Sequence, residues 1–309
     1  MKPPTEFIHD PVMCDEIVEI IASLHSGVFA DLTLGGAGHA AAALNSNPGL
    51  VVHGVDRDDD ALAAAAQHLL DFGARAVTHK ARFDRTATVL QSLDIREISG
   101  FLMDLGVSSP QLDRADRGFS YRLSGPLDMR MDPGQATTAA DVVNSYAPGE
   151  LIDVLRSYGD ERFASRIVEA IVTNRPISTT SELAEIIAEA IPAAARRKST
   201  GHPAKRSFQA IRIEVNDELS ILADTVDSMI SMLASGGVGL VLTYHSGEDR
   251  IVKDRMRRAV EAGSLPGMPA TSDFEWLFRG ARTASEDELE RNPRARSARL
   301  RAIRRSAVS

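Results

Sequence analysis

The chain has 309 residues, of which 43% are hydrophobic, and its formal net charge is −8 at pH 7. This length suffices for a full α/β domain with a sizeable insertion or second domain. The negative charge argues against a protein wrapped in nucleic acid, although a local basic face stays compatible with it. The single cysteine, Cys14, excludes an intrachain disulfide and fits a reducing compartment.

The sequence contains neither a CxxC nor an HExxH motif, so no metal site is predicted. Residues 1–10 lack the apolar core of a signal peptide. No stretch approaches the roughly eighteen apolar residues of a membrane span. We therefore expect a soluble cytoplasmic protein.

Strand and helix patterns alternate through the first third of the chain. The spacing of apolar residues predicts strands at 28–34, 50–55, 76–83 and 98–103, and helices at 12–24, 40–44, 58–70 and 86–93. Such alternation is typical of a doubly wound, mostly parallel sheet. The fold class is therefore predicted to be α/β and Rossmann-like.

The alternation stops after Gln111. No element is obvious at 112–136, and helices are predicted at 148–158, 161–174, 181–191 and 208–233, with a basic, flexible loop at 196–206. A fifth strand at 238–244 and short strands at 274–278 and 298–303 resume the sheet. We therefore predict one α/β domain made of residues 1–111 and 208–309, interrupted by a helical insertion at 112–207.

Two strand ends outline a nucleotide-type cofactor site. A turn containing Gly35, Gly36 and Gly38 precedes a helix, so backbone can approach a ligand and helix N–H groups point at it. Asp56 ends the second strand, where an acid accepts hydrogen bonds from ribose hydroxyls. These features suit NAD and S-adenosylmethionine equally. Asp31 favours S-adenosylmethionine, because its charge attracts the methionine amino group and would repel a pyrophosphate.

A reactive edge is predicted after the fourth strand, at Asp104 and the turn 108–111. An oxygen there could accept the N–H of an amine conjugated to a ring, localise its lone pair and aim it at a methyl sulfonium. An ordinary Ser-Pro turn explains the same residues. Methylation at a pyrimidine ring carbon commonly uses a cysteine, and Cys14 lies in a predicted helix, which favours an exocyclic nitrogen or an oxygen as acceptor.

Two basic clusters stand out in this acidic chain. One is the loop with Arg196, Arg197, Lys198, His202, Lys205 and Arg206, where His202 could contact phosphate when protonated. The other lies at 291–305, where Arg299 and Arg301 alternate with apolar residues, as on an edge strand with one solvated face. A solvated surface explains either cluster, and the loop is the stronger candidate for binding RNA. Arg130 belongs to such a surface or is paired with its acidic neighbours.

Several long motifs occur in order along the chain: His9–Val12, Asp104–Leu112, Arg117–Ser120, Gly125–Asp132, Tyr158–Ala164, His202–Ala204, Phe208–Ala210, Arg212–Ile213, Glu248–Lys253 and Asn292–Ser297. Together they resemble the ribosomal RNA small subunit methyltransferase H family, also called MraW, over nearly the whole length. The resemblance implies a class I S-adenosylmethionine-dependent fold with an inserted helical, RNA-recognising domain. It also implies methylation of the N4 amine of one cytidine in the decoding region, at the P site, of 16S rRNA within the 30S subunit.

The resemblance also assigns residues. With Asp31, the expected cofactor contacts are Ala37, Gly38, His39, Asp56, Phe83, Asp104 and Gln111. Phe83 would stack near the adenine, and His39 would contact the methionine end, although capping of the helix is an equal alternative. The catalytic group is expected to be Asp104, Ser108, Ser109 and Pro110. His245, at the end of the fifth strand, is either catalytic or structural.

Some positions depart from the family pattern. Members usually have glycine where Ala37 stands, a different residue at Gly36, serine at Ala40 and a large apolar residue at Gly247. If position 37 needs a positive φ, the loop must shift. DNA cytosine-N4 methyltransferases carry a Pro-Pro-aromatic signature that Ser109–Gln111 lacks, so stacking on a flipped base must come from elsewhere.

Two rival functions remain open at this stage. One is a DNA cytosine-N4 methyltransferase, against which the missing signature counts. The other is a non-catalytic, cofactor-binding checkpoint of ribosome assembly, which only Ala37 favours. The sequence leaves open whether naked rRNA or the assembled subunit is the substrate, whether the chain forms a homodimer, and which group, if any, takes the proton.

Overall fold

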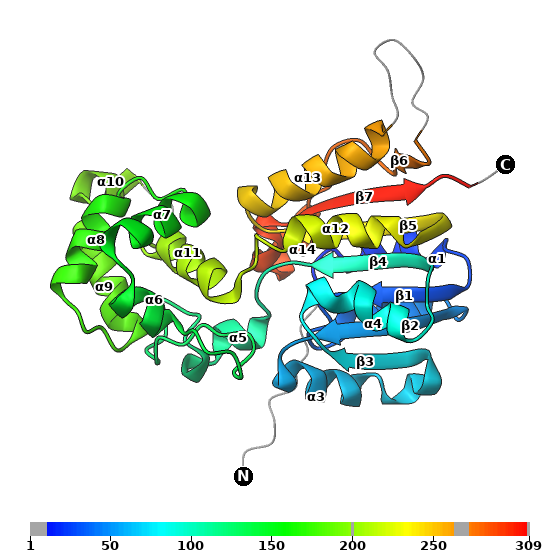
Figure 1. The fold of residues 1–309 in the computed structure, drawn as a ribbon, viewed down its shortest axis with the longest axis horizontal. Coiled ribbons are helices and arrows are strands. Elements are labelled where there is room, and N and C mark those ends of the chain that lie inside the picture. Colours follow the sequence, from blue (N-terminus) through cyan, green and yellow to red (C-terminus); the bar gives the residue numbers. More distant parts are fainter. Residues whose placement is uncertain (1–10, 199–200, 263–271, 308–309) are drawn as a thin grey trace. The chain divides into compact units, whose positions relative to one another are not determined.

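The computed structural model describes residues 11–198, 201–262 and 272–307, and the chain divides into two units (Figure 1). The sheet unit comprises the chain up to Gly106 and again from Ser220 onward. The helical unit is the continuous stretch Val107–Leu219.

A seven-stranded sheet, in the order β3-β2-β1-β4-β5-β7-β6, forms the centre of the sheet unit. Its strands are β1 (Gly27–Asp31), β2 (Leu50–Asp56), β3 (Ala76–Lys80), β4 (Ile98–Asp104), β5 (Leu233–Thr243), β6 (Phe274–Trp276) and β7 (Arg299–Arg305). The first five run parallel, and β7 is antiparallel to both β5 and β6. The predicted α/β, mostly parallel class is confirmed.

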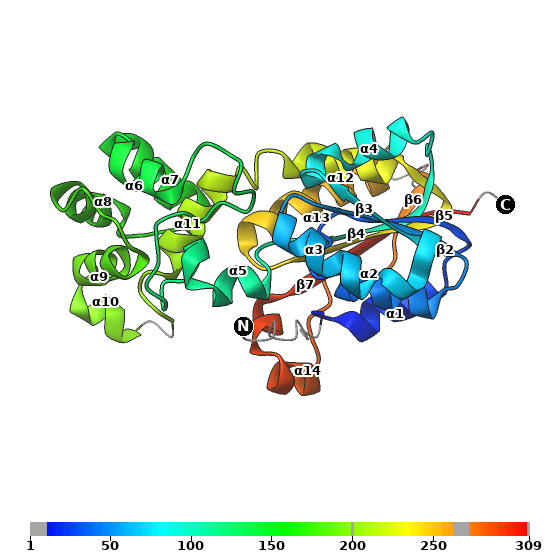
Figure 2. The same cartoon turned by 90° about the horizontal axis from the view of Figure 1, so that it is seen from below.

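Helices cover both faces of this sheet. They are α1 (Cys14–Ala22), α2 (Gly38–Ser46), α3 (Asp59–His68), α4 (Thr86–Ser92), α12 (Leu222–Ser231), α13 (Ser246–Glu261) and α14 (Glu286–Arg291), with 3-10 turns η1 (Leu70–Arg75), η2 (Phe83–Arg85) and η4 (Pro293–Ser297). Figure 2 shows α1 and α2 on one side of the sheet and α4 and α12 on the other. No helix in the described ranges is both long and apolar enough to cross a membrane.

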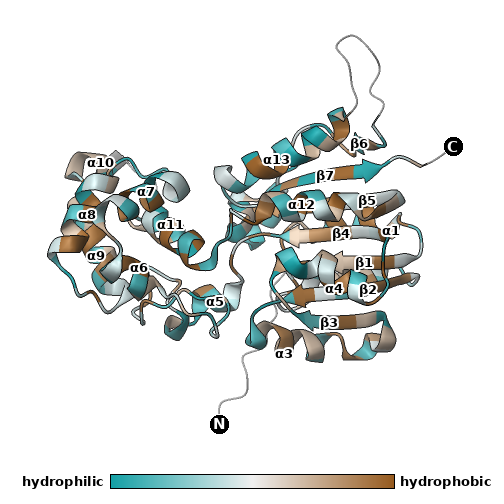
Figure 3. Ribbon diagram, in the orientation of Figure 1, coloured by the Kyte–Doolittle hydropathy of each residue, from teal (hydrophilic) through white to brown (hydrophobic). Residues whose placement is uncertain are grey.

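The central strands are apolar throughout because both of their faces are covered. Phe101, Leu102 and Met103 of β4 are fully buried, as are Leu240 and Val241 of β5. Figure 3 shows the hydrophobic colouring along these strands. In β1, β2 and β4, the apolar run therefore ends only at the last residue of the strand, which is an aspartate in each case.

Several predicted elements differ from the observed ones, and the first strand ends at Asp31 instead of residue 34. The third strand stops at Lys80, and Phe83 begins η2 instead of ending the strand. The helix expected at 208–233 is two helices, because Asp217 adopts a left-handed conformation with φ 54° that ends the first of them. Helical periodicity continues across that break, so the apolar pattern did not reveal it.

The helical unit has its own core. Its elements are α5 (Ser109–Asp113), η3 (Ala115–Arg117), α6 (Ala139–Ser145), α7 (Pro148–Gly159), α8 (Ala164–Thr173), α9 (Thr180–Ala190), α10 (Ala193–Lys198) and α11 (Lys205–Asn216). Leu151, Ile167, Leu183 and Ile211 are fully buried in one cluster, each from a different helix. The unit thus buries an apolar interior without a strand, as an inserted helical domain would.

The boundary of the helical unit differs from the predicted 112–207. Helix α11 packs on α7 and α6, and Phe208 and Ile211 lie in the core of the helical unit. The segment 208–219, predicted for the second half of the α/β domain, therefore belongs to the helical unit. Of the basic segment 196–206, predicted to be a loop, residues 196–198 end α10 and residues 205–206 begin α11, whereas 201–204 lie outside any helix, as predicted.

The C-terminal strand is not an edge strand, which corrects the expectation for Arg299 and Arg301. β7 lies between β5 and β6. Arg301 is 6% exposed, and its guanidinium donates to both carboxylate oxygens of Asp249 on α13, at 2.8 and 3.0 Å. Arg301 is therefore one half of a buried ion pair, whereas Arg299 is exposed, as expected.

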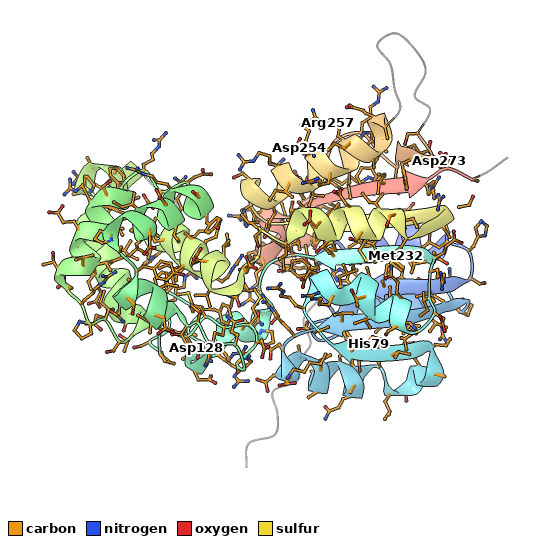
Figure 4. The ribbon with its side chains drawn as sticks, in the orientation of Figure 1. His79, Asp128, Met232, Asp254, Arg257 and Asp273 are labelled. Atoms are coloured by element: carbon orange, nitrogen blue, oxygen red, sulfur yellow. The ribbon has the colours of Figure 1, made fainter. Side chains whose placement is uncertain are left out.

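We expect Asp249→Asn to lower the free energy of unfolding by about 2 kcal/mol, because it leaves the buried guanidinium of Arg301 without a counter-charge. Urea unfolding measures this. On the same helix, Asp254 and Arg257 form an exposed pair at 3.2 Å (Figure 4). Asp254→Asn is the matched control and should change stability by less than about 0.5 kcal/mol. Equal effects of the two variants would contradict this account.

Candidate active site

Three carboxylates and a histidine gather at the carboxyl ends of the central strands. Asp31, Asp56 and Asp104 end β1, β2 and β4, and His39 lies in the first turn of α2. β1 is the switch point of the sheet, since the chain passes to β2 on one side of it and to β4 on the other. Ligands of open α/β sheets bind at such a point.

Asp56 is tied to the glycine turn. Its two carboxylate oxygens accept hydrogen bonds from the N–H of Gly35 at 2.8 Å and of Asp58 at 2.9 Å. Burial raises the pKa of Asp56, and these two hydrogen bonds oppose the rise. Since each carboxylate oxygen can accept two hydrogen bonds, Asp56 retains capacity for ligand hydroxyls. Asp58, in turn, caps α3 by accepting the N–H of Asp60 at 3.1 Å.

Ala37 takes the left-handed conformation that favours glycine. Its φ is 62° and ψ 26° at the N-cap of α2, and its N–H donates to the carbonyl of Leu34 at 2.8 Å. The following Gly38 lies so close to Pro11 that an added Cβ would come within 2.6 Å of the proline Cγ. The alanine therefore adopts the turn that a glycine would, at a cost of about 1–2 kcal/mol.

We expect Ala37→Gly to change the free energy of unfolding by less than about 1 kcal/mol, because relief of strain offsets a lost buried methyl and a more flexible backbone. Ala37→Val should lower it by about 2 kcal/mol, since a branched side chain opposes a positive φ more strongly. Urea unfolding separates the two. Ala63→Val, on the exposed part of α3, should cost about 0.5 kcal/mol. A similarly small loss for Ala37→Val would show that no strain is present.

Asp31 is the most buried of the three acids. It is 1% exposed, and one carboxylate oxygen accepts the N–H of Thr33 at 3.1 Å. The pKa of Asp31 is raised to about 6, mainly by burial and also by the nearby Asp104 and Asp56, while His39 and the Thr33 hydrogen bond act in the opposite direction. A buried carboxylate among other acids is a place where a bound cation is favoured.

Asp104 connects His39 to Tyr244. One oxygen of Asp104 accepts the Tyr244 hydroxyl at 2.7 Å, and the other lies 3.8 Å from His39 Nδ1. His39 Nε2 lies 2.9 Å from the carbonyl of Val12. Because a carbonyl can only accept, Nε2 carries a proton and donates it there, and the other ring nitrogen, Nδ1, faces Asp104. The backbone N–H of Asp104 also donates to the Thr33 hydroxyl at 2.6 Å. Asp104 is 26% exposed, so it is fixed from several sides and still accessible.

Tyr244 is the site residue that the sequence did not reveal. It follows β5 directly, next to the end of β4 where Asp104 stands, and its N–H donates to the buried Glu248 at 2.8 Å. Burial raises the pKa of Tyr244 well above its ordinary value, and Asp104 raises it further, so the phenol stays protonated and donates. Its place at the end of a neighbouring strand was the available signal. His245 accepts the N–H of Glu248 and caps α13, which supports its structural alternative.

The other predicted site residues lie in other elements. Phe83 is half-buried in η2, beyond the end of β3. Ser108, Ser109, Pro110 and Gln111 belong to the helical unit. Ser109–Asp113 form the short helix α5 instead of a turn, with Ser108 as its N-cap. The side chain of the buried Gln111 accepts the Ser108 N–H at 3.0 Å.

The predicted RNA-binding residues lie at the α10–α11 junction of the helical unit. Arg196 and Arg197 are exposed on α10, Lys205 and Arg206 are exposed at the start of α11, and His202 is exposed between the helices. Lys198 ends α10, and its side chain lies outside the described part of the structure. Arg130 is paired internally, which confirms one of its two alternatives: its guanidinium donates two hydrogen bonds of 2.8 Å to Asp128.

Comparison with known proteins identifies the family. The model of the MraW methylase family matches residues 6–306. A "Ribosomal RNA small subunit methyltransferase H" of Mycobacterium sp. (strain KMS) is 45% identical over 99% of this chain and 86% of its own length. The protein of the same name from Thermobifida fusca (strain YX) is 48% identical over 96% of this chain and 93% of its own.

A mostly parallel sheet with acids at its switch point defines an α/β enzyme of the nucleotide-binding class. Within that class, the chain belongs to the MraW methylase family. The resemblance noted in the sequence is thereby confirmed.

Proposed function

We propose that this protein transfers a methyl group from S-adenosylmethionine to the exocyclic N4 of a cytidine in the decoding region of 16S rRNA. The observation that carries the proposal is the cluster of Asp31, Asp56 and Asp104 at the switch point of the sheet. Relatives named for methylation of small-subunit rRNA support the choice of substrate. We expect the reaction to take place in the cytoplasm, on the 30S subunit or its rRNA.

The residues of the sheet unit fit this cofactor. Asp56 would accept ribose hydroxyls, and the backbone around Ala37 and Gly38 would approach the methionine end. Asp31 would pair with the methionine ammonium, because a buried carboxylate with a raised pKa gains most from a nearby cation. Phe83 and Gln111 remain expected contacts. The cofactor supplies an electrophilic methyl carbon on a sulfonium.

The chain's own contribution is to position the amine. Asp104 would accept one N–H of the cytidine amine, and the 108–110 segment would accept or orient the other, so that the nitrogen lone pair points at the methyl carbon. A C–N bond forms as the C–S bond breaks, and the nitrogen then releases a proton to water. Asp104 is suited to this task because Tyr244 fixes one of its oxygens.

We expect Tyr244→Phe to lower kcat about tenfold with little change in the Kd for S-adenosylmethionine. The variant removes only the hydroxyl that orients Asp104, and a poorly oriented group costs catalysis more than binding. Steady-state methyl transfer and equilibrium dialysis measure the two quantities. A fall in affinity with normal kcat would instead assign Tyr244 to the cofactor.

The function is tested by offering radiolabelled S-adenosylmethionine with unmodified 30S subunits, naked 16S rRNA and duplex DNA in parallel, followed by nucleoside analysis. Label in N4-methylcytidine from subunits or rRNA is the expected result, and the preferred form identifies the natural substrate. Label in DNA would favour a DNA cytosine-N4 methyltransferase. Cofactor binding without label would favour a non-catalytic assembly factor.

A further inference from the structure

An exposed aromatic stack stands on the helical unit, next to its basic segment. The His202 and Tyr121 rings lie parallel, with centroids 4.6 Å apart and an interplanar angle of 19°. The Arg122 guanidinium lies 5.7 Å from the Tyr121 centroid. His202 and Arg122 are both exposed. An exposed ring backed by a second ring and a cation is the surface on which nucleobases stack.

The stack is anchored to the core of its unit. Phe208, which is buried, meets the edge of Tyr121 with centroids 5.8 Å apart and an angle of 83°. On its other side, the Ala204 N–H donates to His202 Nδ1 at 3.2 Å. The position of each ring is thus set by contacts within the helical unit.

The loop that carries Tyr121 and Arg122 is also held in place. Gly125 and Thr180 exchange hydrogen bonds, from Thr180 N–H to the Gly125 carbonyl at 2.9 Å and from Gly125 N–H to the Thr180 hydroxyl at 3.0 Å. The Thr180 hydroxyl also donates to the carbonyl of Leu123 at 2.6 Å. Leu123 is itself 38% exposed, an apolar side chain directly after Arg122. An ordered loop presenting aromatic, cationic and apolar groups is preorganised for a ligand.

The charge around the stack indicates a polyanion as the partner. Residues 196–206 hold five basic residues and no acid, although the chain as a whole is acidic. The pKa of His202 lies below its ordinary value, mainly because the ring is partly buried and to a smaller extent because the Arg122 guanidinium is nearby. Its imidazole is therefore mainly neutral at pH 7, which suits stacking and not the phosphate contact expected from the sequence.

We infer that the Tyr121–His202 stack, with Arg122, is a nucleobase-binding platform for an unpaired nucleotide of the RNA substrate. The inference rests on the proposed function for the identity of the nucleic acid. Lys205 and Arg206, in the first turn of α11, would neutralise the adjacent phosphates.

The test uses the full chain and two fluorescent single-stranded RNA oligonucleotides, one of mixed sequence and one with abasic internal nucleotides. His202→Ala should weaken binding of the mixed-sequence RNA about fivefold to tenfold, the low end for loss of one stacked base. It should leave binding of the abasic RNA within about twofold. His202→Phe should restore binding, since it keeps the ring and removes the titratable nitrogens.

Lys205→Ala is the control for a phosphate contact. It should weaken both oligonucleotides equally and reduce the salt dependence of binding by about one phosphate equivalent. Equal losses on both RNAs for His202→Ala, or failure of His202→Phe to restore binding, would overturn the platform. Thermal unfolding of each variant verifies the fold. RNA binding is measured here without methyl transfer. If the enzyme methylates subunits but binds the mixed-sequence and abasic oligonucleotides equally well, the platform is refuted while the proposed function stands.

Discussion

Asp104→Ala should reduce kcat/KM for methyl transfer to the 30S subunit by at least about 100-fold. Asp104 ends β4, its oxygens face Tyr244 and His39, and its side chain is partly exposed. Losing the group that orients the reacting amine removes both positioning and polarisation of the nucleophile, which together contribute rate factors of this size. Steady-state methyl transfer with saturating cofactor measures the effect.

The control for Asp104→Ala is Asp71→Asn, which changes an exposed acid on η1 of the same unit. That variant should transfer methyl groups at the unaltered rate. Asp104→Asn adds a second comparison, because it retains one acceptor oxygen and should lose less activity than alanine. Full turnover by Asp104→Ala would remove Asp104 from the reaction.

Asp31→Asn should weaken binding of S-adenosylmethionine at pH 7.5 by at least about 30-fold, because a buried charge would lose its partner. The wild-type protein should also show a characteristic pH dependence. The pKa of Asp31 is raised to about 6 without ligand, and a bound cation would lower it. Above pH 6 the carboxylate is already ionised, so affinity is at its maximum. Below pH 6 binding must release a proton, so affinity falls by up to tenfold per pH unit.

Calorimetric titrations between pH 5 and 8, in two buffers of different ionisation enthalpy, measure both affinity and proton release. Below pH 6, the Asp31→Asn protein should show neither the fall in affinity nor the release of a proton on binding. Its free energy of unfolding should be unchanged or higher at pH 7.5, since a costly buried charge is gone. If the pH dependence survives in Asp31→Asn, another group is responsible.

The local pattern of apolar and acidic residues was sufficient to predict the parallel strands and the acids at their carboxyl ends. β2 and β4 are apolar runs that end in Asp56 and Asp104, and burial on both faces of a parallel strand leaves such a run in the sequence. The switch-point rule then places the acids on one edge. These parts of the site follow from the order of residues alone.

Contacts between distant residues were not predictable in the same way. Tyr244 acquires its role from Asp104, 140 positions earlier in the chain. Its place at the end of a predicted strand indicates the edge of the sheet at which it lies, but not the partner that its hydroxyl finds there. The position of β7 inside the sheet depends on pairing with β5 and β6, so Arg301 resembled a surface residue. The helix α13 was missed because its sequence is mostly charged, and only a narrow strip, including Val252 and Met256, is buried.

The interrupted sheet has a consequence for how the chain is made. The partner of β4 is β5, and the whole helical unit is synthesised between them. At ordinary rates of translation, the apolar edge of β4 waits roughly ten seconds for its neighbour. The helical unit, built from local contacts, can fold during that interval. We therefore expect the nascent chain to present a hydrophobic strand with one unpaired edge to chaperones before the sheet is complete.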